Sequence, residues 1–471
     1  MIFNSFVFVV FYLVVLALYW TVPYKFRWVL LLAASYFFYM WWNVAYIGLI
    51  ILSTAIDYVI SNRLLTRDDE RTRKLGLIAS VVMNLGLLFV FKYYGFFQES
   101  LAAIFGMFGI GFTPATSHVL LPVGISFYTF QTMSYTIDVY RRQLKPEPHA
   151  GRFALYVSFF PQLVAGPIER ATALLPQLNA PPRKWDHTRF RSGLAQTLFG
   201  LFKKVCVADT LALHVDAVYG NHTLQGGADL ALATVLFAFQ IYCDFSGYSD
   251  IALGTARMMG IELMENFRLP YFSKSVTEFW QRWHISLSTW LRDYLYIPLG
   301  GNRHGKWHTY RNLMLTMLLG GLWHGANWNF VTWGGLNGAY LAAERALGVG
   351  RKAVVHALPL RAMRVVITFT LICITWVFFR SQDLDQALDV FRAIGTWQGD
   401  FFIRDMGVFL NLSGMLAVLL ACEFFYMRGR TMRSLIDGWS DLRTGIFCAV
   451  LLLLIGLFGV SDGSQFIYFQ F

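Results

Sequence analysis

One histidine stands in an apolar segment rich in glycine and tryptophan, residues 320–330 (GGLWHGANWNF). An imidazole has a pKa of about 6.5 and suits general acid–base catalysis, but burying it in apolar surroundings is costly unless it has a partner or lines a cavity. His324 is therefore the leading candidate for a functional residue. Trp323 would form a rigid wall beside it. Asn327, three residues on, would share its helical face and hold the ring in one tautomer.

A second histidine, His284, lies upstream in residues 279–288 (FWQRWHISLS). Trp280 would stack on it at helical spacing, with Trp283 beside it and Arg282 projecting elsewhere. The segment fits a functional site and an interfacial aromatic belt with one histidine in it equally well.

Two carboxylates, Asp244 and Asp250, fall in or beside an apolar run, together with Tyr248. Unpaired carboxylates at membrane depth are expelled or protonated. They must therefore pair with a cation or line a polar cavity, and a structural ion pair is as plausible as catalysis. Gln131 is a further polar group within an apolar run, expected to line a tunnel or join helices.

The sequence offers no support for a metal site. His304 and His308 are four residues apart, but they lie in a basic loop with no third ligand nearby. The five cysteines lie mostly in apolar runs without the spacing of a metal or disulfide motif.

Composition places these residues in a membrane protein. The 471 residues are 56% hydrophobic, 17% aromatic and only 14% charged, whereas a soluble domain has about 25% charged residues. Apolar runs near the ~20 residues that span a bilayer recur along the chain. We expect an all-α polytopic membrane protein with about eleven transmembrane helices, plus re-entrant and amphipathic helices around a central tunnel. The net charge of +11 is attributed to cytoplasmic loops rather than to nucleic-acid binding.

Loop charges suggest an orientation. The first apolar run, Ile2–Trp20, has no cleavage site and is followed by Lys25 and Arg27. Basic residues favour the cytoplasmic side, so the N-terminus is expected outside. A basic segment at 428–443 precedes the last apolar run, which places the C-terminus outside as well.

The chain reads as a single membrane domain, residues 1–471. Residues 257–311 are basic and aromatic without a clean span, and are expected to form amphipathic or re-entrant helices on the cytoplasmic side. Residues 462–471 would form an extracytoplasmic tail with an aromatic ending, either an interface anchor or a peptide that enters a cavity.

Together, the blocks around His284 and His324, the 244–250 block, residues 122–131 and the aromatic ending resemble the membrane-bound O-acyltransferase family, in particular its bacterial alginate O-acetyltransferase branch. The resemblance implies a tunnel lined by two histidines, with His324 as the principal catalytic residue and His284 as the second. It also implies an acyl relay through a tyrosine of the C-terminal hexapeptide, which is Tyr468 here.

The resemblance further implies location in the bacterial inner membrane and acetylation of an exported polysaccharide such as alginate, cellulose or another surface glycan. With the orientation that the loop charges suggest, both termini would be periplasmic. Acetyl-CoA would be the donor, held by Arg282, Arg292 and Asn302, with no permanently bound cofactor. The expected partners are a periplasmic SGNH-type acetyltransferase, the export machinery and membrane lipid. A proton-coupled transporter and a non-catalytic scaffold are the alternatives from other classes.

Overall fold

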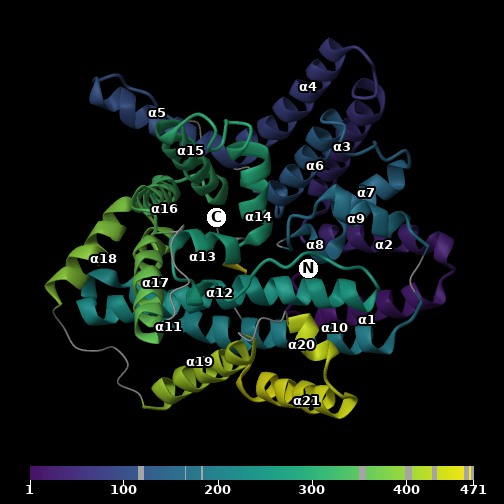
Figure 1. Ribbon diagram of the computed structural model, residues 1–471. Coiled ribbons are helices and arrows are strands. Elements are labelled where there is room, and N and C mark those ends of the chain that lie inside the picture. The colour runs from purple at the N-terminus through teal and green to yellow at the C-terminus, as the bar shows by residue number, and fades with distance from the viewer. Residues whose placement is uncertain are drawn as a thin grey trace. The chain divides into compact units, whose positions relative to one another are not determined.

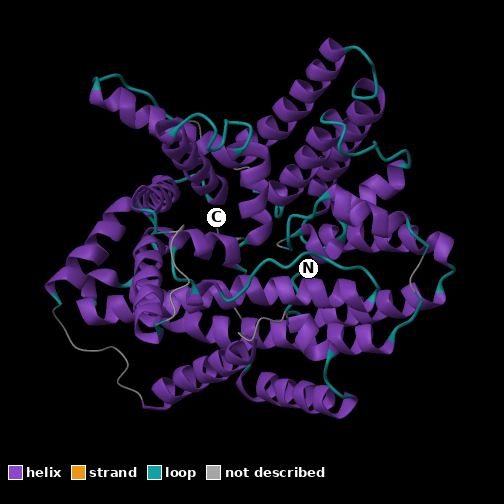
Figure 2. Ribbon diagram, viewed as in Figure 1, coloured by secondary structure: helices purple, strands orange, loops and turns teal. Residues whose placement is uncertain are grey.

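The computed structural model describes residues 1–114, 121–164, 166–181, 184–349, 357–397, 406–426, 432–460 and 466–467. These residues form helices joined by loops (Figure 1), with no strand among them (Figure 2). The chain divides into two compact units. Unit 1 comprises Met1–Asp186 and Thr255–Leu263, and unit 2 comprises His187–Gly254 and Met264–Phe471.

Unit 1 is built from nine α-helices and three short 3₁₀ or π segments in its described residues. They are α1 (Phe6–Thr21), α2 (Tyr24–Met40), η1 (Val44–Tyr46), α3 (Ile47–Val59), η2 (Ile60–Leu64), α4 (Glu70–Leu88), η3 (Phe89–Tyr93), α5 (Tyr94–Met107), α6 (Ile125–Tyr140), α7 (Ala150–Ser158), α8 (Phe160–Leu163) and α9 (Ala171–Asn179).

A buried polar network joins three of these helices. The Asp57 carboxylate of α3 accepts hydrogen bonds from Ser80 (2.5 Å) and Asn84 (2.9 Å) of α4, and Thr132 of α6 donates to Asn84 (3.2 Å). Gln131, next to Thr132, donates to the backbone carbonyl of Tyr156 in α7 at 2.7 Å. These bonds satisfy polar groups that apolar surroundings would otherwise penalise, so they fix how the helices pack. For Gln131 this is the helix-joining role, one of the two expected from the sequence.

Unit 2 holds the remaining helices (Figure 1). They are α10 (His187–Leu201), η4 (Phe202–Ala208), α11 (Asp209–Gly220), η5 (His222–Leu224), α12 (Gly227–Met258, whose last four residues are assigned to unit 1), η6 (Pro270–Phe272), α13 (Val276–Arg282), α14 (Ile285–Leu291), η7 (Arg292–Tyr296), α15 (Lys306–His324), α16 (Trp328–Leu347), α17 (Leu358–Arg380), α18 (Leu384–Thr396), α19 (Met406–Tyr426), α20 (Met432–Asp437) and α21 (Asp441–Phe458).

Five helical stretches of the described residues are long and apolar enough to cross a membrane: Val44–Leu64, Glu70–Met107, Gly227–Met258, Leu358–Arg380 and Asp441–Phe458. The apolar helices Phe6–Thr21 and Leu412–Phe424 are shorter. The expected all-α membrane protein is confirmed, whereas the count of about eleven spans and the central tunnel remain predictions.

Residues 257–311 contain short helices, as their lack of a clean apolar run suggested. The end of α12 is followed by η6, α13, α14 and η7 before α15 begins. Local capping explains one of these starts. The Ser275 hydroxyl accepts from the Glu278 amide (3.0 Å), and the Glu278 carboxylate accepts from the Lys274 amide (2.8 Å), which satisfies amides at the start of α13. The expected cytoplasmic placement stays a prediction.

Candidate active site

Helices α15 and α16 form a close hairpin that carries His324 at its turn. A methyl group at Gly321 of α15 would lie 2.2 Å from the carbonyl oxygen of Phe330, and one at Gly334 of α16 would lie 2.3 Å from that of Met317. The two backbones can approach this closely because both positions lack a side chain. The hairpin thereby fixes His324, the last residue of α15, against α16.

His324 is almost fully buried, with 3% of its surface exposed, in an aromatic surround. Its ring meets Trp323, Trp333 and Phe379 edge to face, with centroids 5.0, 5.1 and 5.5 Å away. Such packing restricts the orientation of the imidazole.

His324 also lines a pocket of about 400 Å³ in unit 2. The other walls come from α13, α14, η7, α15 and α16, and include Thr277, Trp280, Gln281, Ile285, Leu287, Ser288, Thr289, Leu291, Arg292, Tyr296, Leu313, Thr316, Met317, Gly320, Trp333 and Leu341. This volume falls within the ~300–1,000 Å³ of small-molecule sites. A mostly apolar pocket with a few polar groups and one imidazole at its wall can bind an organic substrate and exchange a proton with it.

His284 lies close to His324. It joins α13 to α14 and is fully buried, and its ring centroid is 6.2 Å from that of His324. Trp323 lies against both imidazoles, 5.9 Å from His284 by ring centroids. The structure therefore brings together the two histidines singled out in the sequence, although only His324 lines the pocket.

The backbone and the protonation state of His284 are both unusual. Its φ of 42° and ψ of 54° place it in the left-handed region, which costs a non-glycine residue energy and is frequent at functional sites. Burial lowers the pKa of His284 to about 3 from 6.5. The imidazole is therefore neutral at neutral pH.

The expected role of Asn327 beside His324 is wrong in its geometry. Helix α15 ends at His324, and Gly325 is extended, so Asn327 is not on the same helix. Asn327 instead caps α16: its side-chain oxygen accepts from the Asn329 amide (2.9 Å), and its side-chain nitrogen donates to the Gln382 carbonyl (2.9 Å). Asparagine is a preferred N-cap residue, and this preference competes with the helical spacing from His324.

The three residues expected at the donor site have different surroundings. Arg292 lines the pocket and pairs with Asp293 at 2.7 Å. Arg282 pairs with Glu278 at 2.6 Å, and Asn302 is exposed. Of the three, only Arg292 is among the residues that line the pocket.

Trp283 is a core residue: it is 1% exposed and packs against Phe267, Phe279 and Trp376. Its surroundings are aromatic, and it is not among the pocket-lining residues. It directly precedes His284 in the chain.

The Asp244 block of α12 meets the end of the chain. Asp244 pairs with Lys204 of η4 at 2.6 Å and accepts a hydrogen bond from the Ile467 amide at 2.8 Å. Tyr248, one turn on, lies against Phe466 with ring centroids 4.9 Å apart. The two described residues of the 462–471 tail are thus buried in unit 2, whereas Tyr468 lies outside the described residues.

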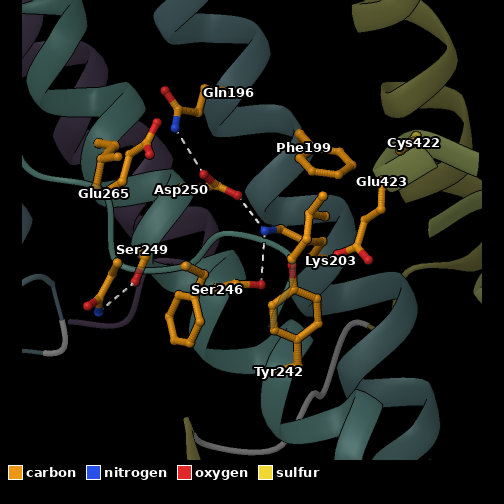
Figure 3. A pocket seen from close by; sticks show the side chains of 14 residues that line it. Gln196, Phe199, Lys203, Tyr242, Ser246, Ser249, Asp250, Glu265, Cys422 and Glu423 are labelled. Carbon is orange, nitrogen blue, oxygen red and sulfur yellow. Dashed lines mark hydrogen bonds and ion pairs between the residues drawn. The ribbon is translucent and has the colours of Figure 1, made fainter. Parts of the chain in front are cut away.

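Asp250 lines a second, smaller cavity of about 40 Å³ (Figure 3). Lys203 of η4 forms an ion pair with Asp250 and donates to Ser246 at 2.9 Å, and Gln196 donates to Asp250 at 2.9 Å. Asp244 and Asp250 therefore both pair with buried lysines, and Asp250 also lines a polar cavity. Sequence reasoning missed Lys203 and Lys204, although two adjacent lysines inside an apolar run should have indicated partners for these aspartates.

The family follows from comparison with known proteins. Residues 140–381 match the family model of MBOAT, the membrane-bound O-acyltransferase family. The probable alginate O-acetylase AlgI of Azotobacter vinelandii is 44% identical over 428 residues, which cover 89% of this chain and 83% of that protein. The protein of the same name from Pseudomonas aeruginosa is 45% identical, with 91% of this chain and 82% of that protein covered.

A relative named for another substrate is the peptidoglycan O-acetyltransferase of Helicobacter pylori, 32% identical over 94% of this chain and 91% of that protein. This chain therefore belongs to the membrane-bound O-acyltransferase family, in the branch of the alginate O-acetylases, and is an O-acyltransferase.

Proposed function

We propose that this protein transfers an acetyl group from a cytoplasmic thioester, acetyl-CoA, across the inner membrane for O-acetylation of an exported polysaccharide of the alginate type. The observation that carries the proposal is the position of His324 in the wall of the ~400 Å³ pocket. The names of the relatives support acetyl transfer to a polysaccharide, and alginate is the glycan that several of them share.

His324 acts as general base in this mechanism. It takes the proton of the attacking hydroxyl as the oxygen adds to the thioester carbonyl carbon. The tetrahedral intermediate then collapses, the C–S bond breaks, and the proton passes from His324 to the leaving thiolate. The acetyl ester and the free thiol are the products, and no oxidant or reductant is needed. A positioned base contributes about 10²–10⁴-fold to such a step.

The pocket suits a thioester donor. Its apolar walls, including Trp280 and Leu341, exclude water from the reacting carbonyl, and Arg292 contributes a cation to its lining. We propose that Arg292 binds a phosphate of the donor, since guanidinium forms strong bonds with phosphate oxygens. Donor binding by Arg282 and Asn302 remains a proposal, and neither residue is among those that line the pocket.

The acceptor hydroxyl belongs to Tyr468 or to a serine of a periplasmic SGNH-type partner. A bulky polymer would reach a membrane pocket with difficulty, so a relay is favoured over direct attack by the sugar. Burial of Phe466 and Ile467 in unit 2 supports a tail that enters the protein rather than one that lies only at the membrane interface. Both termini are proposed to lie in the periplasm.

Acetylation of peptidoglycan is the second candidate, because one relative with high coverage carries that name. Cellulose and other surface glycans are tested in the same assay by exchanging the acceptor. A proton-coupled transporter would move its substrate unchanged, and a scaffold would neither move nor modify it.

The test is transfer of radiolabelled acetyl from acetyl-CoA by purified protein, with the periplasmic partner and alginate present. We expect label on the polymer with the wild type, loss of at least about 10²-fold in the His324→Ala variant, and near wild-type transfer in His308→Ala, which alters an exposed histidine. Equal transfer by His324→Ala and wild type would refute the base assignment. Transfer to peptidoglycan but not to alginate would show that peptidoglycan is the acceptor.

A further inference from the structure

The side chain of Asn266 is placed to control the protonation of His284. Asn266 precedes η6 in the loop after α12 and is 2% exposed. Its side-chain oxygen Oδ1 lies 3.2 Å from Nδ1 of His284, and its backbone carbonyl accepts from the Ile285 amide at 2.9 Å. The same residue thus contacts the imidazole and binds the backbone immediately after it.

The hydrogen bonds of Ser286 settle which atom of the Asn266 amide faces His284. The Ser286 backbone N–H donates to this atom at 3.1 Å. A backbone amide can only donate, so the atom must be the carbonyl oxygen rather than the NH₂ group. The Ser286 hydroxyl donates to the same oxygen at 2.9 Å.

An amide oxygen can only accept hydrogen bonds, so its 3.2 Å contact with Nδ1 of His284 is a hydrogen bond only when Nδ1 carries a proton. An unprotonated Nδ1 would set its lone pair against those of Asn266 at 3.2 Å. The Ser286 hydroxyl lies 3.5 Å from Nδ1 and 2.9 Å from the Asn266 oxygen, so the oxygen is its better partner. A neutral imidazole with a proton on Nδ1 has its lone pair on Nε2.

We propose that Asn266 is a positioning residue that holds His284 as the Nδ1–H tautomer, so that Nε2 is a hydrogen-bond acceptor. This inference rests on the proposed acetyl transfer and assigns the role that the sequence left open. His284 cannot donate from Nε2 to an oxyanion in this state. Its Nε2 can accept a hydrogen bond, and His324, which takes the proton of the attacking hydroxyl in the proposed mechanism, lies 6.2 Å away by ring centroids.

The backbone of His284 supports the same role. A left-handed conformation is strained for a non-glycine residue, so it persists only where surrounding contacts hold the backbone in place. The bonds from Ile285 and Ser286 to Asn266 fix the turn on its C-terminal side. The side chain and the backbone carbonyl of Asn266 therefore fix both the orientation and the tautomer of the His284 imidazole.

Several elements pack around His284, and any charge that they carry affects its pKa. Phe245 of α12 lies 4.7 Å away by ring centroids, Ser286 belongs to α14, and Trp323 and His324 come from α15. Of these, His324 is titratable. A carboxylate in place of the Asn266 amide would add a negative charge beside Nδ1–H, which favours the imidazolium and raises the pKa of His284.

The test has a spectroscopic arm that does not depend on turnover. Purified protein with ¹⁵N-labelled histidine rings is compared with the His284→Ala variant to assign the His284 signals. Near neutral pH we expect a protonated Nδ1 and an unprotonated Nε2. A proton on Nε2, or an imidazolium, would overturn the tautomer assignment.

The kinetic arm uses three variants of the same network. Asn266→Ala should lower kcat roughly tenfold or more with little change in KM, because a buried hydrogen bond is lost. Asn266→Asp keeps the acceptor and adds a negative charge beside Nδ1–H, so the pH titration of the His284 ¹⁵N signals should show a pKa above that of the wild type. Ser249→Ala removes a 3.5 Å contact on the amide nitrogen side and is the matched control, with the wild-type kcat and the wild-type His284 titration.

The outcomes separate this inference from the proposed function. Wild-type kcat in a folded Asn266→Ala variant, or an unchanged pKa of His284 in Asn266→Asp, would contradict the role of Asn266. If the alanine variant does not fold, the aspartate variant and the ¹⁵N signals still decide. Absence of acetyl transfer by the wild type would sink the proposed function while leaving the tautomer measurable.

Discussion

The close approach of α15 and α16 should make two adjacent glycines of α16 respond differently to the same substitution. A methyl group at Gly334 would lie 2.3 Å from the Met317 carbonyl oxygen, whereas one at Gly335 would meet Leu318 at an ordinary 3.5 Å. Real Cβ contacts do not fall below 3.0 Å, so Gly334→Ala must separate the helices by about 0.7 Å (3.0 minus 2.3). Both substitutions replace glycine by alanine within a helix and gain the same helix propensity, so this contribution to stability cancels when the two variants are compared.

The separation reaches His324. Trp333, next to Gly334, packs on His324 with ring centroids 5.1 Å apart. A shift of α16 therefore moves the Trp333 ring against which the imidazole packs. Overpacking costs about 1–3 kcal/mol of stability, and a misplacement near 1 Å costs up to about 10²-fold in rate. We expect Gly334→Ala to lower kcat/KM by roughly tenfold to a hundredfold, and Gly335→Ala to stay within about twofold of the wild type.

The assay is acetyl transfer by purified variants in detergent or nanodiscs, with thermal unfolding measured on the same samples. The comparison is made below the unfolding transition of both variants, so that loss of folded protein is not read as loss of catalysis. If Gly334→Ala and Gly335→Ala have equal kcat/KM and equal midpoints, the close contact of α15 with α16 does not hold His324 in place.

Three further predictions follow from the buried contacts. Lys204→Met should destabilise the protein by about 3–5 kcal/mol, because it leaves Asp244 buried without its cation, and a thermal midpoint equal to that of the wild type would contradict this. Asn327→Ala should cost about 1 kcal/mol through loss of the α16 cap while Asn327→Asp retains most of it, as chemical denaturation would show; equal losses would argue against capping. Asn84→Leu should destabilise unit 1 by about 1–3 kcal/mol, since Asp57 loses a buried donor, and unchanged protease resistance of the 1–186 segment would count against the network.

The sequence predicted the residues of the site better than their geometry. His284 and His324 could be identified because an imidazole in an apolar segment needs a reason to be there, and the structure places their rings 6.2 Å apart. Asn327 was misplaced because helical spacing was extended past Gly325, where the backbone becomes extended and α15 ends. The N-cap preference of asparagine carried the competing signal.

Other features depend on long-range contacts and could not be predicted from spacing. Asn266 reaches His284 across 18 residues, and Lys204 meets Asp244 across 40 (244 minus 204). Both separations are far longer than the three- or four-residue spacing of neighbours on one helix, so no local pattern marks the pairing. The buried aspartates predictably needed cationic partners, but only the fold shows which lysines supply them.

The proposed binding of the acyl donor beside His324 can be tested directly by thiol protection. Thr316 lines that pocket and can be replaced by cysteine in a variant whose five native cysteines are alanine, with His324→Ala added to prevent turnover. Leu224, which is 83% exposed and lies outside the pocket, provides the matched control thiol. We expect acetyl-CoA to slow modification of the thiol at position 316 by a membrane-permeant reagent and to leave the thiol at 224 unaffected. Equal modification rates at position 316 with and without saturating acetyl-CoA would contradict a donor site in this pocket.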